Sequence, residues 1–277
     1  MSASELIDFS KLCIHTITTK PWDVETAIEK YANAGIGGIT VWRQWLEGRD
    51  IEKIGNSIRE HNLSLVSLCR GGFFPAADQQ GVDAAIEDNR LAIREAAALG
   101  APMIVLVCGA VPGQPLTKSR KQITDGIAAV LPLAEELGIK LAIEPLHPVY
   151  ADDRSAINTM AQANAVCDEL DHDLVGIAAD VYHIWWDPDL EEQIRITGEK
   201  NRLFAFHICD WMTPTSDLLN DRGLMGEGCI DIKGIRKMVE ATGFAGFNEV
   251  EVFSNRWWSQ DQDEFLAAIK KAYLENS

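Results

Sequence analysis

Residues 174–209 read LVGIAADVYHIWWDPDLEEQIRITGEKNRLFAFHIC, a stretch in which two apolar runs flank a segment with helical periodicity. The runs 174–180 and 202–209 are short, rich in Ile, Leu, Val and Phe, and apolar almost throughout. This composition is typical of parallel strands that are covered on both faces. The segment 188–199 has the length of a helix that carries the chain back to the start of the next parallel strand. The stretch therefore predicts one strand–helix–strand unit.

The same alternation extends through all 277 residues. Eight strand-then-helix units predict an α/β fold, a single (β/α)₈ TIM barrel formed by residues 1–277. A doubly wound sheet is the alternative, but no GxGxxG or phosphate-binding glycine loop follows the first predicted strand. The predicted strands are 12–17, 37–42, 64–69, 103–108, 140–145, 174–180, 202–209 and 247–253. The predicted helices are 22–34, 49–62, 82–99, 117–137, 154–170, 188–199, 231–242 and 260–275.

The composition argues against several kinds of partner. The chain carries 42 acidic and 25 basic residues, a net charge of −17, which disfavours nucleic acid and anionic membranes. It has no apolar stretch near the roughly 20 residues of a membrane span, and MSASELIDFSK lacks the layout of a signal peptide. Six scattered cysteines without a CxxC pair indicate free thiols. We expect a cytoplasmic protein with a small-molecule partner, and a homo-oligomer such as a dimer or tetramer is one possible assembly.

Four acid or imidazole residues end four successive predicted strands: Glu144, Asp180, His207 and Glu251. An acid at one strand end is commonly a helix cap, but four in consecutive units indicate a shared site at the mouth of the barrel. Two Glu, one Asp and one His form an oxygen-rich set that suits one divalent cation. Mn²⁺ is our first choice, with Mg²⁺, Co²⁺ or Zn²⁺ as alternatives. Glu249 shares a strand face with Glu251 and can replace it.

Other residues near strand ends are candidates for contact with a substrate. Trp42 can form an apolar wall against a sugar ring. Arg43 and Arg70 can bind substrate oxygens or a carboxylate, or they can form salt bridges within the acidic mouth. His147 is either a substrate group, a support for the site or an ordinary loop histidine. We assign His15 to the pocket lining rather than to the metal.

Six motifs occur in order along nearly the whole chain: WRQ at 42–44, IEPLHP at 143–148, DVYHIWWDP at 180–188, FHICDW at 206–211, DRGLMGEGCID at 221–231 and GFNEVEVFS at 246–254. Together they resemble the sugar-phosphate isomerase/epimerase family of xylose-isomerase-like barrels, which includes ketose 3-epimerases and inosose dehydratases. The resemblance implies a metal bound by Glu144, Asp180, His207 and Glu251. It also implies that the two glutamates are the catalytic acid/base pair and that His183 and Arg222 hold substrate oxygens.

The chemistry of such a site agrees with this resemblance. A divalent ion that chelates a carbonyl and a neighbouring hydroxyl acidifies the α-C–H, and a nearby carboxylate can then remove the proton. Return of the proton gives epimerisation or isomerisation, whereas loss of a β-substituent gives a dehydratase or lyase. We expect a sugar isomerase or epimerase that acts through an enediolate. The alternative is a lyase acting on a keto-sugar, keto-glycoside or inosose.

Two functions of other classes fit less well. A metal-dependent endonuclease for abasic DNA uses several metals and a basic face, whereas this chain has six histidines and a net charge of −17. A sugar-binding receptor without turnover usually shows a secretion signal and a two-lobed pattern. Neither feature is visible in the sequence, so we expect an enzyme.

Overall fold

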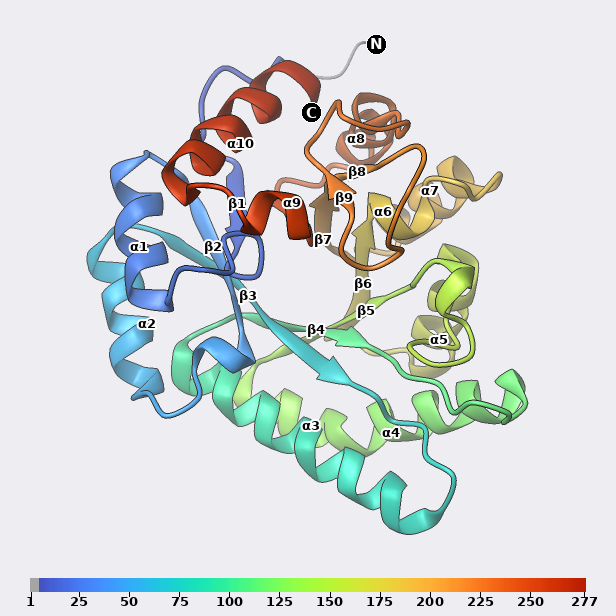
Figure 1. Ribbon diagram of the computed structural model, residues 1–277. Helices are drawn as coiled ribbons and strands as arrows, with labels where there is room; N and C mark the ends of the chain where they lie inside the picture. The colour runs from blue at the N-terminus through green and yellow to red at the C-terminus, as the bar shows by residue number, and fades with distance from the viewer. Residues whose placement is uncertain (1–4) are drawn as a thin grey trace.

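Eight parallel strands close into a barrel in the computed structural model, which describes residues 5–277 (Figure 1). The strands are β1 (Leu12–His15), β2 (Gly38–Trp42), β3 (Ser64–Gly72), β4 (Met103–Val107), β5 (Lys140–Glu144), β6 (Val175–Asp180), β7 (Leu203–Ile208) and β10 (Asn248–Val250). Their order is β1-β10-β7-β6-β5-β4-β3-β2, so each strand pairs with its neighbours along the chain. The predicted TIM barrel is confirmed. The first four residues of the expected domain, 1–277, lie outside the described residues.

A ring of helices surrounds the barrel and connects its strands (Figure 1). The long helices are α1 (Val24–Asn33), α2 (Ile51–Glu60), α3 (Gln79–Leu99), α4 (Leu116–Leu137), α5 (Met160–Leu170), α7 (Leu190–Glu199), α8 (Ile232–Ala241) and α10 (Gln262–Asn276). Each follows a barrel strand, as the sequence pattern predicts. Most of their ends lie within a few residues of the predicted ranges.

The ends of these helices are set by local hydrogen bonds and glycines. The Asp78 carboxylate accepts from the Gly81 amide at the start of α3, and Asp231 accepts from the Gly234 amide at the start of α8. Gly100 ends α3 and Gly138 ends α4 in the left-handed conformation, with φ of +85° and +69°. A side chain with a Cβ rarely adopts this conformation, which explains the glycines after these predicted helices.

Small side chains fill the barrel interior beneath its C-terminal end. Ala142, Ala178 and Ala205 are fully buried there, on β5, β6 and β7. Because side chains alternate between the two faces of a strand, the residue two positions later also faces the barrel axis, one layer nearer the mouth. Those residues are Glu144, Asp180 and His207.

The structure adds short elements that the sequence pattern did not predict. One-turn helices follow two barrel strands: α6 (Val181–Ile184) after β6 and α9 (Asn255–Trp258) after β10. The loop after β7 contains an antiparallel ribbon of β8 (Asp210–Trp211) and β9 (Arg222–Gly223). Two 3₁₀ turns, η1 (Arg43–Trp45) and η2 (Pro148–Tyr150), follow β2 and β5. All of these elements follow the C-terminal ends of barrel strands.

Three predicted boundaries are wrong for identifiable reasons. Strand β10 stops before residue 253, because the Val252 amide donates to the Thr18 hydroxyl instead of continuing the ladder. Helix α5 begins six residues later than expected, because Asn158 donates to the backbone of the preceding loop and Thr159 caps the helix. Strand β3 continues past residue 69 to Gly72 through a bulge.

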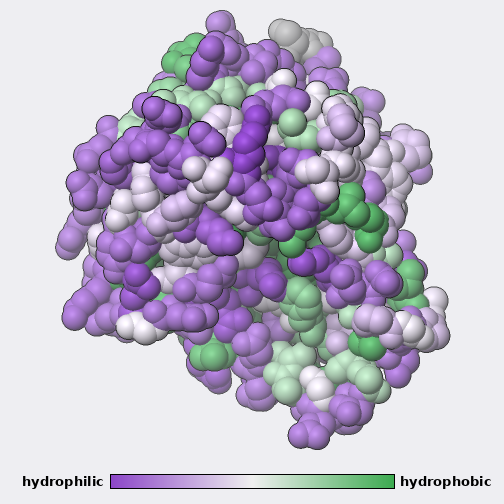
Figure 2. All heavy atoms as spheres, in the orientation of Figure 1, coloured by the Kyte–Doolittle hydropathy of each residue, from purple (hydrophilic) through white to green (hydrophobic). Residues whose placement is uncertain are grey.

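The face of the molecule drawn in Figure 2 is mostly hydrophilic, with hydrophobic residues in scattered patches. This agrees with the acidic composition of the chain. Within residues 5–277, we find no helix with both the length and the hydropathy that crossing a bilayer requires. All six cysteines are free thiols, as expected, and five of them are buried.

Candidate metal and substrate site

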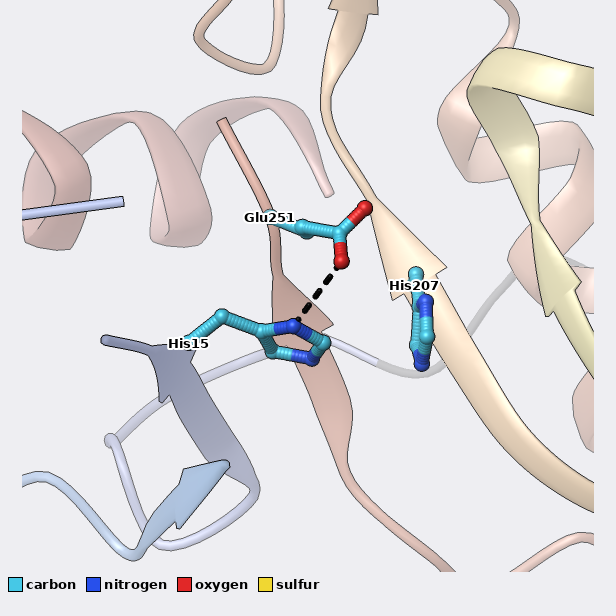
Figure 3. Close-up of side chains that lie close together, drawn as sticks. All are labelled: His15, His207 and Glu251. Carbon is cyan, nitrogen blue, oxygen red and sulfur yellow. Dashed lines mark ion pairs between the residues drawn. The ribbon is translucent and has the colours of Figure 1, made fainter. Parts of the chain in front are cut away.

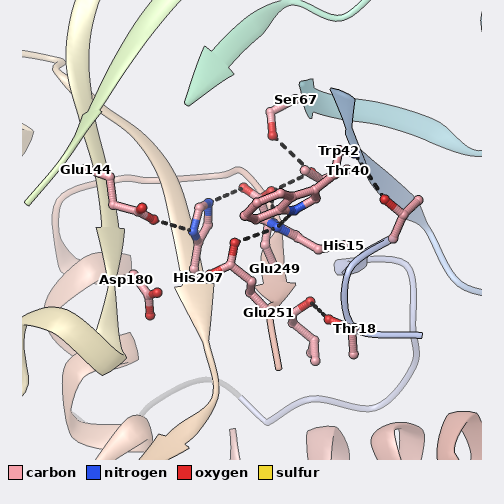
Figure 4. Close-up of polar contacts among 12 residues, drawn as sticks. His15, Thr18, Thr40, Trp42, Ser67, Glu144, Asp180, His207, Glu249 and Glu251 are labelled. Atoms are coloured by element: carbon pink, nitrogen blue, oxygen red, sulfur yellow. Dashed lines mark hydrogen bonds and ion pairs between the residues drawn. The ribbon is translucent and has the colours of Figure 1, made fainter. Parts of the chain in front are cut away.

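The four residues predicted at the strand ends converge in the barrel mouth (Figure 4). Glu144, Asp180 and His207 are carried by β5, β6 and β7, and Glu251 directly follows β10. Each offers a ligand atom, and these atoms all lie within 4.8 Å of one another. All four side chains are buried. The structure therefore brings together, from four adjacent strands, the set that the sequence predicted.

Short polar contacts join members of this cluster to one another, to Tyr182 and to Arg222. His207 Nδ1 lies 3.1 Å from Glu144 Oε1, and one Asp180 oxygen accepts from the Tyr182 amide at 2.8 Å. Arg222 Nη1 contacts Asp180 Oδ2 at 3.1 Å and Glu251 Oε2 at 2.9 Å. His207 Nε2 is buried and has no hydrogen-bond partner. The nearest carboxylate to Nε2 is that of Glu249, whose Oε1 lies 3.9 Å away, so Nδ1 is the ring nitrogen that faces Glu144 and the cluster.

The electrostatics of the cluster also suit a divalent cation. Burial raises the pKa of Asp180 to about 7, against the pull of the Arg222 guanidinium. Burial opposes charge on His207, but Glu249 and Glu144 outweigh it and raise the pKa of His207 to about 9. Both shifts reflect carboxylates concentrated in a dry site. Three carboxylates and an imidazole fit the ligand preferences of Mn²⁺, Mg²⁺, Co²⁺ or Zn²⁺.

Glu249 and Glu251 share a face but have different surroundings. Glu249 is fully buried, accepts from the Thr40 hydroxyl at 2.8 Å, and lies 3.1 Å from His15 Nε2. Its other oxygen, Oε1, has no hydrogen bond and lies 3.9 Å from His207 Nε2. Glu251 is the one of the two whose carboxylate belongs to the four-residue cluster. Glu249 supports the cluster from below, at the side nearer the barrel interior.

His15 links these two glutamates more closely than the sequence suggested. Its Nδ1 lies 3.0 Å from Glu251 Oε1 (Figure 3), and its ring meets that of His207 edge-on, with centroids 4.7 Å apart. Burial would lower the pKa of His15, but contacts with Cys69, Glu249 and Glu251 raise it well above its ordinary value. His15 therefore contacts both carboxylates, and its Nδ1 also lies 3.3 Å from Trp42 Nε1, so His15 helps to hold Glu251 in place. A histidine at the end of the first strand was the only signal for this role.

A pocket of about 240 Å³ opens above the cluster. Among the four clustered residues, only Glu144 and Glu251 also line this pocket. Asp180 and His207 lie beneath it. The two glutamates can therefore contact a molecule in the pocket, whereas Asp180 and His207 do not line it.

Four of the residues predicted to contact a substrate line the same pocket: Trp42, Arg70, His183 and Arg222. Trp42 packs edge-on against Phe253, with ring centroids 5.4 Å apart. His183 Nε2 lies 3.3 Å from Arg222 Nη2. Burial and the charge of Arg222 hold the pKa of His183 well below its usual value.

The other two predicted substrate-binding residues lie elsewhere. Arg43 is held by Asp88 and Glu95 of α3, at 3.0 and 2.6 Å, so it forms the salt bridge that the sequence left open. His147 is half-buried, and its ring packs near Trp211, with centroids 5.0 Å apart. Its backbone N–H lies 3.2 Å from His183 Nδ1. His147 therefore orients a pocket residue through its main chain.

Sequence reasoning missed several residues that line the pocket. Tyr150 and Arg154 come from the loop after β5, and Phe253 follows β10. Gln44 belongs to the WRQ motif but carried no assigned role. Phe253 ends a predicted strand but is apolar, and the other three positions end no predicted strand, so a rule that looks for charged groups at strand ends does not find them.

Comparisons with known proteins extend along the barrel. A family model described as a xylose isomerase-like TIM barrel matches residues 28–273. An inosose isomerase from Bacillus licheniformis is 24% identical over 255 residues, which covers 83% of this chain and 87% of that relative. A crystal structure of a protein from Sinorhizobium meliloti 1021 has a TM-score of 0.92 at 46% identity and covers 95% and 97% of the two chains. The IOLI protein with a bound zinc atom has a TM-score of 0.83 at 22% identity, covering 96% and 97%.

Proposed function

The chain belongs to the xylose isomerase-like TIM-barrel family, and from that premise we propose that it is a divalent-metal-dependent isomerase or epimerase of sugars or related polyol ketones. One observation carries the proposal. Glu144 and Glu251 belong to the buried ligand cluster and also line the pocket above it. A carboxylate in both positions can hold an ion and move a proton at the substrate.

The proposed metal ligands are Glu144, Asp180, His207 and Glu251. A divalent cation held there would polarise a substrate carbonyl and stabilise the enediolate that forms when the α-proton leaves. Mn²⁺ is our first choice because three of the four ligands are carboxylates, and Mg²⁺, Co²⁺ and Zn²⁺ remain alternatives. The zinc atom of the IOLI protein supports a divalent ion on this fold.

The two glutamates are the proposed acid/base pair. In the barrel order, β5 and β10 lie at the two ends of the arc that supplies the cluster, with β6 and β7 between them. Glu144 and Glu251 therefore approach the pocket from different sides. One removes the proton next to the carbonyl, and the other returns a proton to the opposite face or to the neighbouring carbon. His15 supports Glu251 during this transfer through its 3.0 Å contact.

The substrate is a small molecule rich in hydroxyl groups. The pocket of about 240 Å³ lies below the range typical of sites for drug-sized ligands. His183 and Arg222 offer hydrogen bonds to hydroxyl and carbonyl oxygens, and Trp42 offers an apolar wall. The similarity to an inosose isomerase supports a polyol ketone. An elimination would use the same residues, and no contact in this site favours it over proton return.

Two measurements test the proposal. Elemental analysis of the purified protein should find about one divalent ion per chain. The Glu144→Gln and Asp180→Asn variants should not retain this ion. When an inosose is incubated with the metal-loaded enzyme in deuterated water, the isomers that are recovered should carry deuterium next to the carbonyl. Glu251→Gln should slow this exchange by about a hundredfold or more, the scale of general acid–base catalysis.

A matched control and two contrary results complete the test. Glu136→Gln changes an exposed glutamate on α4 and should leave metal content and exchange unchanged. Full metal content in Asp180→Asn would show that the site is elsewhere. An unsaturated product in place of deuterated isomers would assign the enzyme to the lyases.

A further inference from the structure

Two arginines on the wall of the pocket have no hydrogen-bonding or ion-pairing partner among the described residues. Arg70 lies near the end of β3 and Arg154 lies in the loop after β5, and both line the pocket. Within residues 5–277, neither guanidinium makes a hydrogen bond or an ion pair. This is unexpected in a chain with 42 acidic and 25 basic residues. A half-buried charge without a counter-ion is costly, so the pair indicates that a ligand supplies the counter-ion.

A bulge in β3 directs Arg70 toward the pocket. Cys69 pairs with Val105 and Gly71 pairs with Leu106, so Arg70 is the extra residue between them. Cys69 packs inside the barrel, and regular alternation would turn Arg70 outward toward the helices. Bulges of this kind re-aim side chains next to active sites. The side chain therefore reaches the pocket because of a specific departure from strand geometry.

Buried hydrogen bonds brace this bulge. Asn89 of α3 accepts from the Gly72 amide at 2.6 Å and donates to the Gly72 carbonyl at 2.7 Å. A Cβ at Gly71 would lie only 2.7 Å from Asn89 Oδ1, so glycine is needed for this approach. The backbone that carries Arg70 is thus fixed before any ligand arrives.

The backbone that carries Arg154 is fixed as well. Its amide donates to the Tyr150 carbonyl at 3.0 Å, and its carbonyl accepts from the Gly109 amide at 2.9 Å. The Arg154 guanidinium lies 5.7 Å from the ring centre of Tyr150, and that of Arg70 lies 4.3 Å from the ring centre of Phe73. Stacking on an aromatic ring holds a guanidinium in place while its N–H donors stay free.

Nearby carboxylates are already engaged elsewhere. Arg70 also borders a neighbouring hollow that contains Asp88 and Glu95, but both acids are held by Arg43. Burial lowers the pKa of Arg70, and the positive charge of Arg154 adds to this effect, whereas the negative charge of Glu144 opposes it. An anion between the two guanidinium groups would offset the repulsion between them.

We propose that Arg70 and Arg154 form a subsite for an oxoanion, a carboxylate or a phosphate, carried by the substrate. The subsite lies on the β3–β5 side of the pocket, whereas Arg222 and His183 lie on the side of β6, β7 and β10. The assignment of this anion to the substrate rests on the proposed isomerase function. The presence of an anion-binding site does not depend on that function. Guanidinium groups bind both oxoanions through paired hydrogen bonds. The substrate class is therefore an acidic or phosphorylated polyol ketone.

Calorimetric titration of the metal-loaded protein tests the subsite with three six-carbon probes: neutral sorbitol, gluconate as the carboxylate, and sorbitol 6-phosphate. At least one anion should bind ten or more times more tightly than sorbitol. Arg70→Gln and Arg154→Gln should each weaken anion binding about tenfold or more, the usual scale for a charge-assisted hydrogen bond, and leave sorbitol unchanged. Arg70→Lys should recover part of the loss because it keeps the charge. Which anion binds more tightly identifies the substituent.

Two controls keep the result interpretable. Arg94→Gln removes an exposed arginine on α3 and should bind all three probes like the wild type. Because neither pocket arginine bonds to the protein, Arg70→Gln and Arg154→Gln should also melt close to the wild type. Anions that bind no better than sorbitol, or that bind both glutamine variants with wild-type affinity, would overturn the proposal.

Repetition with metal-free protein separates this proposal from the isomerase function. The preference for an anion should persist without metal, because the arginines need no metal to bind it. A preference that disappears with the metal would mean that the probe chelates the ion and would refute the arginine subsite. Intact anion binding without any deuterium exchange would instead refute the isomerase function and leave the subsite standing.

Discussion

Glu249 is a buried carboxylate in which one oxygen accepts a hydrogen bond and the other has none. Oε2 accepts from Thr40 and contacts His15, whereas Oε1 lies 3.9 Å from His207 Nε2. Histidines that bind metals usually donate their other ring nitrogen to a carboxylate or carbonyl, which fixes the ring and strengthens the ligand. Glu249 is positioned for this role toward His207, and it acts through that residue rather than on the substrate.

We therefore predict that Glu249→Gln weakens metal binding by about tenfold or more, the scale found for such supporting residues. Competition with a chelator of known affinity measures the change. The melting temperature of the metal-free variant distinguishes positioning from a general loss of structure, because only the latter lowers it strongly. Wild-type metal affinity in Glu249→Gln would mean that Glu249 serves the fold and not the ligand.

Two arginines show how far residue-level prediction from sequence can go. Arg43 and Arg70 both follow predicted strands, and the sequence left each open between substrate and salt bridge. Arg43 forms ion pairs with Asp88 and Glu95 of α3, whereas Arg70 lies at the bulge, lines the pocket and forms no ion pair with either acid. The outcome depends on how α3 packs against the barrel and on one extra residue in β3. Neither is visible in a pattern of apolar residues.

The loop between β7 and α8 is organised by a single carboxylate. Asp210 Oδ2 accepts from the amides of Gly226 and Gly228, and Oδ1 accepts from the Ile230 amide, at 2.9 to 3.0 Å. Asp210 is almost completely buried. This loop carries Arg222 into the pocket, so the position of Arg222 depends on Asp210.

We predict that Asp210→Ala destabilises the protein by about 2 kcal/mol, because several backbone N–H groups lose their acceptor. The variant should also raise the KM for substrate, since Arg222 is no longer held in place. Urea unfolding and steady-state kinetics measure the two effects. Asp173→Ala, at an exposed position before β6, is the matched control and should change neither. An Asp210→Ala enzyme with wild-type KM would show that Arg222 is positioned by its ion pairs alone.

Long elements were predictable and short ones were not. Buried parallel strands and amphipathic helices repeat a pattern over many residues, so all eight barrel strands were found. The ribbon β8–β9 has two residues per strand, and α6 and α9 have four residues each, which is too short for a periodic signal. These elements are held by side-chain contacts such as those of Asp210.

At the scale of the whole molecule, the barrel explains why one rule could predict that these four residues converge. Closure places the C-terminal ends of all strands at one face, so a charged residue at each end must meet the others. The same rule does not predict pocket residues that lie in the loops after the strands, such as Tyr150 and Arg154. The barrel topology determines that the four proposed ligands converge, whereas the packing of the loops determines the shape of the pocket.

Because the ligands come from four adjacent strands, metal binding should stabilise the barrel as a unit. A ligand that binds only the folded state adds about 2.7 kcal/mol at a hundredfold excess over its dissociation constant. For a chain of this size, that corresponds to a rise in Tm of roughly 5 to 10 °C. We predict this rise when Mn²⁺ is added to protein stripped with a chelator, measured by scanning calorimetry. Asp180→Asn should lose most of it, because that variant lacks a ligand from the middle of the arc. An equal rise in Asp180→Asn would place the stabilising ion outside the four-strand site.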